Sequence, residues 1–170
     1  MNKNNYYLKG LLTFLGLLLL HTAVGQTYCT SAARNNGDSR CDNVKLVGNS
    51  TTIDNNSASG CAKYTDFTSV TPAELSAGQE YTVTITHGTC GWDYNRQSNA
   101  WIDFNQDGDF NDAGEQLKAR PTSTRTAGYE HEITFTVPCN AVAGNTRMRV
   151  IVIEGTANNP CANNYGWGET

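Results

Sequence analysis

The chain has 170 residues, a net charge of −4 and a mean hydropathy of −0.48. Its 16 acidic residues outnumber its 12 basic residues. This balance argues against nucleic acid or an anionic membrane surface as a partner, because both require a basic face.

The first 25 residues have the pattern of a cleavable export signal. Lys3 and Lys9 give a positive start, residues 11–20 form a short apolar run, and small residues precede Gln26. The run is too short to cross a bilayer as a helix, which needs about 20 apolar residues. We therefore expect cleavage before Gln26 and a secreted or cell-surface protein without a membrane span. Without Lys3 and Lys9, the mature chain has 10 basic against 16 acidic residues.

Residues 26–170 are long enough for a single domain, and they contain all the cysteines. These are Cys29, Cys41, Cys61, Cys90, Cys139 and Cys161. An even number after an export signal predicts three disulfides, although six cysteines allow 15 pairings and free buried thiols are the alternative. The pairing we expect is Cys29 with Cys161, Cys41 with Cys61, and Cys90 with Cys139. A zinc site is disfavoured, because no Cys-x-x-Cys pair is present and His87 and His131 are isolated in the sequence.

No stretch beyond the signal has a helical period, and strand-like runs recur between turns rich in Gly, Asn, Thr and Ser. The expected strands are residues 43–47, 80–86, 100–104, 132–137 and 146–153. We predict one all-β domain over residues 26–170, an antiparallel β-sandwich of jelly-roll or immunoglobulin-like type stapled by disulfides. No closing strand is expected after Cys161, which would leave a neighbouring strand as an exposed edge.

The segment from Asp103 to Glu115, hereafter the acidic loop, is the most informative part of the sequence. Oxygen-bearing side chains fall at alternate positions, and Gly108 supplies a sharp turn after the third of them. Calcium binds six to eight oxygen ligands, and a loop that curls around the ion can supply them from every second residue. The predicted calcium ligands are Asp103, Asn105, Asp107, Asp109 and Glu115.

The acidic loop departs from an EF-hand in two respects. Gly114 stands where the closing Glu belongs, so Glu115 comes one residue late, and the flanking segments are strand-like rather than helical. The alternative is a polar hairpin loop without an ion. We favour calcium, because several carboxylates in so short a segment repel one another without a cation. Magnesium is disfavoured, because it requires a stricter octahedron and retains several waters.

No catalytic residues are predicted. His131 and Glu132 begin a zinc-protease pattern, but Phe135 stands where its second His must be, and no nucleophile elbow is present. Trp92 and Tyr94 lie in a Gly- and Asn-rich loop that suits contact with a sugar ring or a protein. The simpler interpretation, which we favour, is that these rings cover the edge of a small core.

Several segments of the chain resemble the GEVED domain. They are residues 28–29, 61–68, 75–83, 101–110 and 143–150. The resemblance extends from about Tyr28 to Thr170 and implies a secreted accessory or adhesive module of the kind found in multidomain Bacteroidetes proteins. The family has no catalytic activity to transfer. Its Gly-Glu-Val-Glu-Asp signature and the strand that follows are met here only as far as Gly168, Glu169 and Thr170, so the resemblance implies truncation within the signature.

Two functions follow from these patterns. The first is a non-catalytic binding or accessory module, ordered by calcium, that attaches to a cell surface, a glycan or a protein. The second is the amino-terminal fragment of a secreted multidomain hydrolase, such as a peptidase, whose catalytic domain lies beyond residue 170.

Overall fold

The computed structural model describes residues 27–57, 60–117, 126–156 and 159–170. The predicted signal over residues 1–25 lies outside the described residues. Nine strands and no helix are found in the described part of the chain. Consistently, these ranges contain no helix with the length and apolarity needed to cross a membrane.

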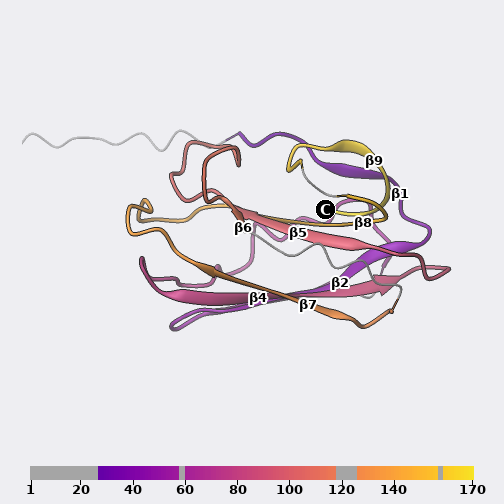
Figure 1. The fold of residues 1–170 in the computed structure, drawn as a ribbon, viewed down its shortest axis with the longest axis horizontal. Coiled ribbons are helices and arrows are strands. Elements are labelled where there is room, and N and C mark those ends of the chain that lie inside the picture. Colours follow the sequence, from indigo (N-terminus) through magenta and orange to yellow (C-terminus); the bar gives the residue numbers. More distant parts are fainter. Residues whose placement is uncertain (1–26, 58–59, 118–125, 157–158) are drawn as a thin grey trace, which may run out of the picture.

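The strands form two sheets that pack face to face, which confirms the predicted β-sandwich (Figure 1). The five-stranded sheet has the order β1-β9-β8-β5-β6, and the four-stranded sheet has the order β3-β2-β4-β7. The strands are β1 (Ala32–Asn35), β2 (Ser39–Val47), β3 (Thr52–Asn56), β4 (Glu80–Thr89), β5 (Gln97–Ile102), β6 (Gln116–Leu117), β7 (Glu130–Thr136), β8 (Met148–Ile153) and β9 (Asn163–Glu169).

The expectation that no strand follows Cys161 is wrong. Strand β9 runs parallel to β1 and then meets β8 at its end, where Glu169 pairs with Val152 and Gly168 with Ile153. β9 is rich in Asn and Gly, so its own sequence gives no strand pattern. The two neighbouring strands supply the hydrogen-bond partners instead. All other strand pairs in the described residues are antiparallel.

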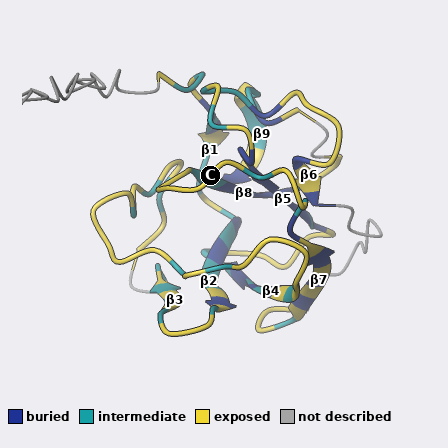
Figure 2. Ribbon diagram, turned by 90° about the vertical axis from the view of Figure 1, so that its left-hand side faces the viewer, coloured by how far each residue is buried: buried dark blue, intermediate teal, exposed yellow. Residues whose placement is uncertain are grey.

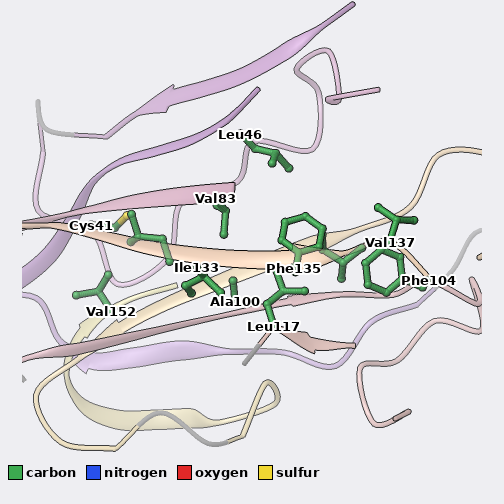
Figure 3. Close-up of a cluster of buried hydrophobic side chains, with 12 residues drawn as sticks. Cys41, Leu46, Val83, Ala100, Phe104, Leu117, Ile133, Phe135, Val137 and Val152 are labelled. Atoms are coloured by element: carbon green, nitrogen blue, oxygen red, sulfur yellow. The ribbon is translucent and has the colours of Figure 1, made fainter. Parts of the chain in front are cut away.

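The main core lies between the two sheets (Figure 3). Along β7, exposed and buried residues alternate strictly, and Ile133 and Phe135 point inward. Val83 and Ile85 of β4 face the same layer and are fully buried. The period of two in these sequences therefore places one face of the four-stranded sheet in the core and leaves the other in water.

A second apolar cluster covers the outer face of the five-stranded sheet. It contains Trp101, Phe110, Ile151 and Ile153, with Tyr28 and Tyr165 packed against them. Strands β5 and β8 are consequently buried on both faces, which explains why β5 is almost continuously buried (Figure 2). Phe110 belongs to the acidic loop, so this second cluster attaches the loop to the sheet.

The structure has two disulfides rather than the three predicted. Cys29 is bonded to Cys161, as expected, but the second disulfide joins Cys61 to Cys90. The expected pairs Cys41–Cys61 and Cys90–Cys139 are therefore wrong. Cys41 points into the core from β2 and is a buried free thiol, whereas Cys139 is an exposed one.

Candidate functional site: the acidic loop

The acidic loop occupies the whole connection between β5 and β6. Strand β5 ends at Ile102 and β6 begins at Gln116, and the Ile102 amide donates a 2.9 Å hydrogen bond to the Glu115 carbonyl. The predicted turn at Gly108 is present, with a φ of 93° that favours glycine. The ring of Phe110 stacks on Tyr28 at 5.1 Å. The hydrogen bond between Ile102 and Glu115 therefore joins the two ends of the loop, and the packing of Phe110 on Tyr28 holds its middle in place.

The Asp103 carboxylate is fully buried and organises the first half of the loop. Its Oδ1 accepts the Gln106 amide at 2.6 Å, and its Oδ2 accepts the Gly108 amide at 3.0 Å and the Tyr28 hydroxyl at 2.7 Å. Burial and the hydrogen bond to Asp103 raise the pKa of Tyr28 to about 12. The phenol therefore stays protonated and remains a donor to the carboxylate.

The Glu115 carboxylate is also buried, and it organises the second half of the loop. Its Oε1 accepts the Phe104 amide at 3.1 Å and its Oε2 accepts the Asp112 amide at 3.2 Å. Burial raises the pKa of Glu115, and the charge of Asp103 adds to this effect, whereas the hydrogen bonds from the Asp112 and Phe104 amides oppose it. Both buried carboxylates thus bind the loop's own N–H groups.

Three further aspartates gather on the solvent side of the loop. One carboxylate oxygen from each of Asp107, Asp109 and Asp112 lies within 4.8 Å of the others. The Asn105 side-chain amide bridges two of them, donating to Asp107 Oδ2 at 2.9 Å and to Asp112 Oδ2 at 2.7 Å. The hydrogen bond from the Asp109 amide, followed by that from Asn105, lowers the pKa of Asp107. These contacts keep anionic oxygens close together.

Side chains also bond to the backbone two residues ahead in this half of the loop. The Asp107 amide donates to Asn105 Oδ1 at 3.1 Å, the Asp109 amide to Asp107 Oδ1 at 3.1 Å, and the Asn111 amide to Asp109 Oδ1 at 2.8 Å. Such turns suit Asn and Asp. They curl the chain so that the three carboxylates face one another.

The structure divides the predicted calcium ligands into two groups. Asn105, Asp107 and Asp109 lie at the exposed cluster. Asp103 and Glu115 are buried and accept hydrogen bonds from backbone amides of the loop. Asp112 joins the cluster, and the sequence analysis missed it. Asp112 lies three residues after Asp109, out of phase with the alternate positions on which the prediction rests.

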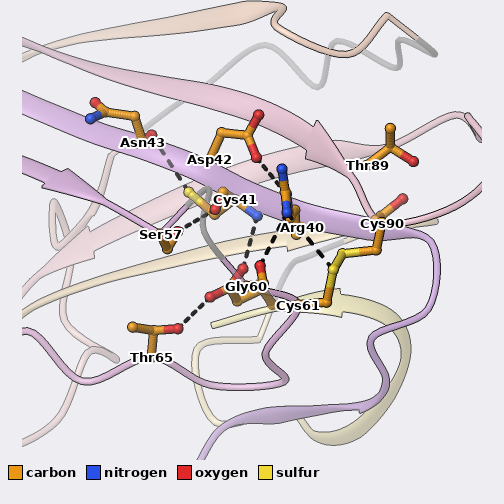
Figure 4. Close-up of polar contacts among 12 residues, drawn as sticks. Arg40, Cys41, Asp42, Asn43, Ser57, Gly60, Cys61, Thr65, Thr89 and Cys90 are labelled. Atoms are coloured by element: carbon orange, nitrogen blue, oxygen red, sulfur yellow. Dashed lines mark hydrogen bonds and ion pairs between the residues drawn. A yellow bond between two sulfur atoms is a disulfide. The ribbon is translucent and has the colours of Figure 1, made fainter.

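Trp92 and Tyr94 do not cover the core. Trp92 is 78% exposed and Tyr94 45% exposed. The backbone of Trp92 is nevertheless fixed, because its amide donates to Asp38 Oδ1 at 3.3 Å and its carbonyl accepts the Thr89 hydroxyl at 3.0 Å. The Cys61–Cys90 disulfide anchors the same loop (Figure 4). The expectation that these rings close the core is therefore wrong, and a rigid loop presents an indole to solvent.

The fold brings together His87 and His131, which the sequence analysis treated as isolated. The Ser98 hydroxyl lies between them, 2.8 Å from His87 Nε2 and 2.7 Å from His131 Nδ1. All three residues are buried. A hydroxyl has one proton, so it donates to one ring and accepts from the other. Ser98 is only 1% exposed and is out of reach of a substrate, so this cluster is part of the core.

Comparison with known families matches residues 97–170 to the GEVED domain model. The resemblance predicted from the sequence is thereby confirmed over this segment, which contains the acidic loop. GEVED is a family of non-catalytic accessory domains, so the match indicates an accessory module. This match and the two disulfides are compatible with an extracellular protein. No curated protein and no solved structure matches the chain.

Proposed function

We propose that this chain, which carries a GEVED domain over residues 97–170, is a secreted, non-catalytic attachment module whose acidic loop binds calcium. The observation that carries the proposal is the cluster of Asp107, Asp109 and Asp112, whose carboxylate oxygens lie within 4.8 Å of one another on a loop folded around two buried carboxylates. The role of the ion is to order the loop, and attachment uses the rigid surface that results.

The chemistry of the cluster favours calcium over a transition metal. Every side chain at the cluster offers oxygen, and hard oxygen ligands suit calcium and magnesium rather than zinc or copper. The ligands come from a loop and not from a rigid pair of helices, which suits the flexible coordination of calcium. Extracellular calcium modules have dissociation constants of about 10⁻⁴ to 10⁻³ M and are filled outside the cell.

Calcium is expected to raise the melting temperature of EDTA-treated protein. An ion present at 100 times its dissociation constant stabilises the folded state by about 2.7 kcal/mol. For a domain of this size that corresponds to a rise of about 5–10 °C. The measurement is a thermal melt followed by circular dichroism, with and without calcium.

Two substitutions that each remove one negative charge make the test specific to the loop. Asp112→Asn removes one carboxylate of the cluster and is expected to abolish the calcium-dependent rise, while the apo protein melts at the same or a higher temperature because repulsion is relieved. Glu132→Gln changes an exposed carboxylate on β7 and should leave the rise intact. A wild-type melting curve that does not respond to calcium at up to about 100 mM, which is 100 times the upper end of these dissociation constants, would defeat the proposal.

A second candidate function is recognition of a glycan through Trp92. The exposed indole on a backbone held by Asp38 and Thr89 is the observation in its favour. A flat aromatic face presented without conformational freedom suits stacking on a sugar ring, because little entropy is lost on binding.

This candidate predicts binding on a glycan array that is weaker in Trp92→Ala. Stacking contacts of this kind are worth about 1 kcal/mol or more, so binding should fall by about fivefold or more. Val47→Ala, which removes another exposed apolar side chain, should leave it unchanged. Absence of binding by the wild-type protein on a broad array would contradict glycan recognition through Trp92.

A further inference from the structure

The acidic loop packs against residues 28–29, which precede β1 and lie far from the loop in the sequence. The Tyr28 hydroxyl donates to Asp103 Oδ2 at 2.7 Å, across 75 positions of the chain. The Tyr28 ring stacks on the Phe110 ring, with the centroids 5.1 Å apart. Tyr28 therefore contacts the loop twice, at the carboxylate where the loop begins and at the aromatic ring in its middle.

The hydrogen bond to Asp103 is connected to the aspartate cluster by one further contact. The same oxygen, Asp103 Oδ2, accepts the Gly108 amide at 3.0 Å. Gly108 lies between Asp107 and Asp109 in the sequence, and its φ of 93° belongs to the turn that connects them. By holding the Asp103 carboxylate, the phenol thus also holds the turn that brings two of the clustered aspartates together.

Tyr28 is held in turn by its neighbour Cys29. Cys29 is bonded to Cys161, and the buried Arg149 of β8 contacts the backbone on both sides of this disulfide. Its guanidinium donates to the Cys29 carbonyl at 2.7 Å and to the Pro160 carbonyl at 2.6 Å. The disulfide and the guanidinium therefore fix the backbone beside Tyr28 relative to the five-stranded sheet.

Two guanidinium groups complete the packing around the aromatic pair. That of Arg147 lies over the Tyr28 ring, 4.7 Å from its centre, and that of Arg149 lies over the Phe110 ring at 4.9 Å. A guanidinium within about 6 Å of a ring centre is attracted to it. Residues 28–29, the acidic loop and β8 thus contribute to one packed unit, and Tyr28 is half-buried within it.

This unit matters most when no ion is bound. The three clustered carboxylates repel one another, so the repulsion favours open conformations of the ion-free loop in which the carboxylates separate. Only the closed fraction of the loops binds the ion, and the apparent dissociation constant rises in inverse proportion to that fraction. A contact that favours the closed loop therefore increases the calcium affinity without touching the ion.

We propose that Tyr28 is a positioning residue for calcium, and that the Cys29–Cys161 disulfide holds it against Asp103 and Phe110. The calcium affinity of the acidic loop consequently depends on this disulfide. The inference rests on the proposed calcium binding by the loop. It adds that residues outside the loop, which contribute no ligand to the cluster, set the strength of that binding.

Tyr28→Phe tests the contact, because it removes the hydroxyl and keeps the ring on Phe110. In the calcium-free protein, the Gly108 amide should exchange about tenfold faster, since the closed loop loses one hydrogen bond to a charged acceptor. A calcium titration followed by ¹⁵N NMR should give a dissociation constant about two- to tenfold larger. A purely structural role would lower the stability of the calcium-free and calcium-loaded protein equally and leave the dissociation constant unchanged. Tyr129→Phe, which removes the hydroxyl of another half-buried tyrosine, is the matched control and should change neither quantity.

The two disulfides provide a second comparison. Replacing Cys29 and Cys161 by alanine should weaken calcium binding in the same way as Tyr28→Phe. Replacing Cys61 and Cys90, whose disulfide anchors a different loop, should leave the calcium affinity unchanged. Tyr28→Phe retains both disulfides, so it tests the contact even where a cysteine variant fails to fold.

The outcomes separate this inference from the proposed function. Calcium binding by the wild-type protein with an affinity that Tyr28→Phe leaves unchanged overturns the positioning role, while the proposed function stands. Equal losses of affinity in the two double cysteine variants overturn the dependence on Cys29–Cys161. A wild-type protein that binds no calcium overturns the proposed function and this inference together.

Discussion

Replacing Cys29 and Cys161 together by alanine is expected to lower the free energy of unfolding by about 5 kcal/mol. This disulfide joins residues 132 positions apart, and the loss follows from the greater conformational freedom of an unfolded chain without the cross-link. The same estimate for Cys61–Cys90, with a separation of 29, is about 3.6 kcal/mol. Denaturant unfolding of the two double variants measures the difference.

Cys139→Ala serves as the control, because Cys139 is an exposed free thiol and its replacement should change stability by less than about 0.5 kcal/mol. Peptide mapping of the non-reduced protein checks the pairing itself. A larger loss for the Cys61–Cys90 variant than for the Cys29–Cys161 variant would contradict the account, as would a fragment that contains Cys41 bonded to Cys61.

Stability is also expected to fall as the pH is lowered from about 6.5 to 4, because of His87. Burial, and then the charges of His131 and Arg96, lower the pKa of His87 from 6.5 to about 4. The unfolded state therefore binds a proton more readily than the folded state in this window, and stability that is complete above pH 6.5 is lost toward pH 4. At about 1.4 kcal/mol per pH unit, the loss reaches about 3 kcal/mol.

His87→Gln isolates this contribution, because it keeps a polar group beside Ser98 and does not titrate. The difference in unfolding free energy between wild type and variant should shrink as the pH falls through the window. The raised pKa values of Glu115 and Glu169 act in the opposite direction, favouring the folded state as the pH falls, and they are common to both proteins. Parallel pH profiles for the two proteins would show that His87 is not the group responsible.

The acidic loop could be located from the sequence alone because its composition differs sharply from its flanks. Asp, Asn and Gly make up most of residues 103–115, whereas apolar strand residues precede them, and the structure places strand ends at Ile102 and Gln116. The sequence could not predict which carboxylates of the loop are buried and which face solvent. Alternation treats Asp103 and Asp107 alike, but only the fold buries the first against Tyr28 and leaves the second in solvent.

Strands with strong alternation were predicted, and strands that depend on their neighbours were missed. Residues 80–86 and 132–137 were recognised because each buries one face. β1, β3 and β9 are short or polar and exist because adjacent strands offer hydrogen bonds. The same limit explains the wrong disulfides. Pairing depends on which face of β2 carries Cys41, and spacing along the chain does not report that face.

A calcium titration of the ¹⁵N-labelled protein followed by NMR tests the central claim most directly. The Asn105 side-chain amide donates to Asp107 Oδ2 and Asp112 Oδ2, so an ion bound at this cluster changes the surroundings of that NH₂ group. We predict saturable shifts of that NH₂ group and of the Asp107, Asp109 and Asp112 backbone amides, with half-saturation at about 10⁻⁴ to 10⁻³ M. An Asn105 side-chain signal that stays unchanged through this range would contradict a calcium site in the acidic loop.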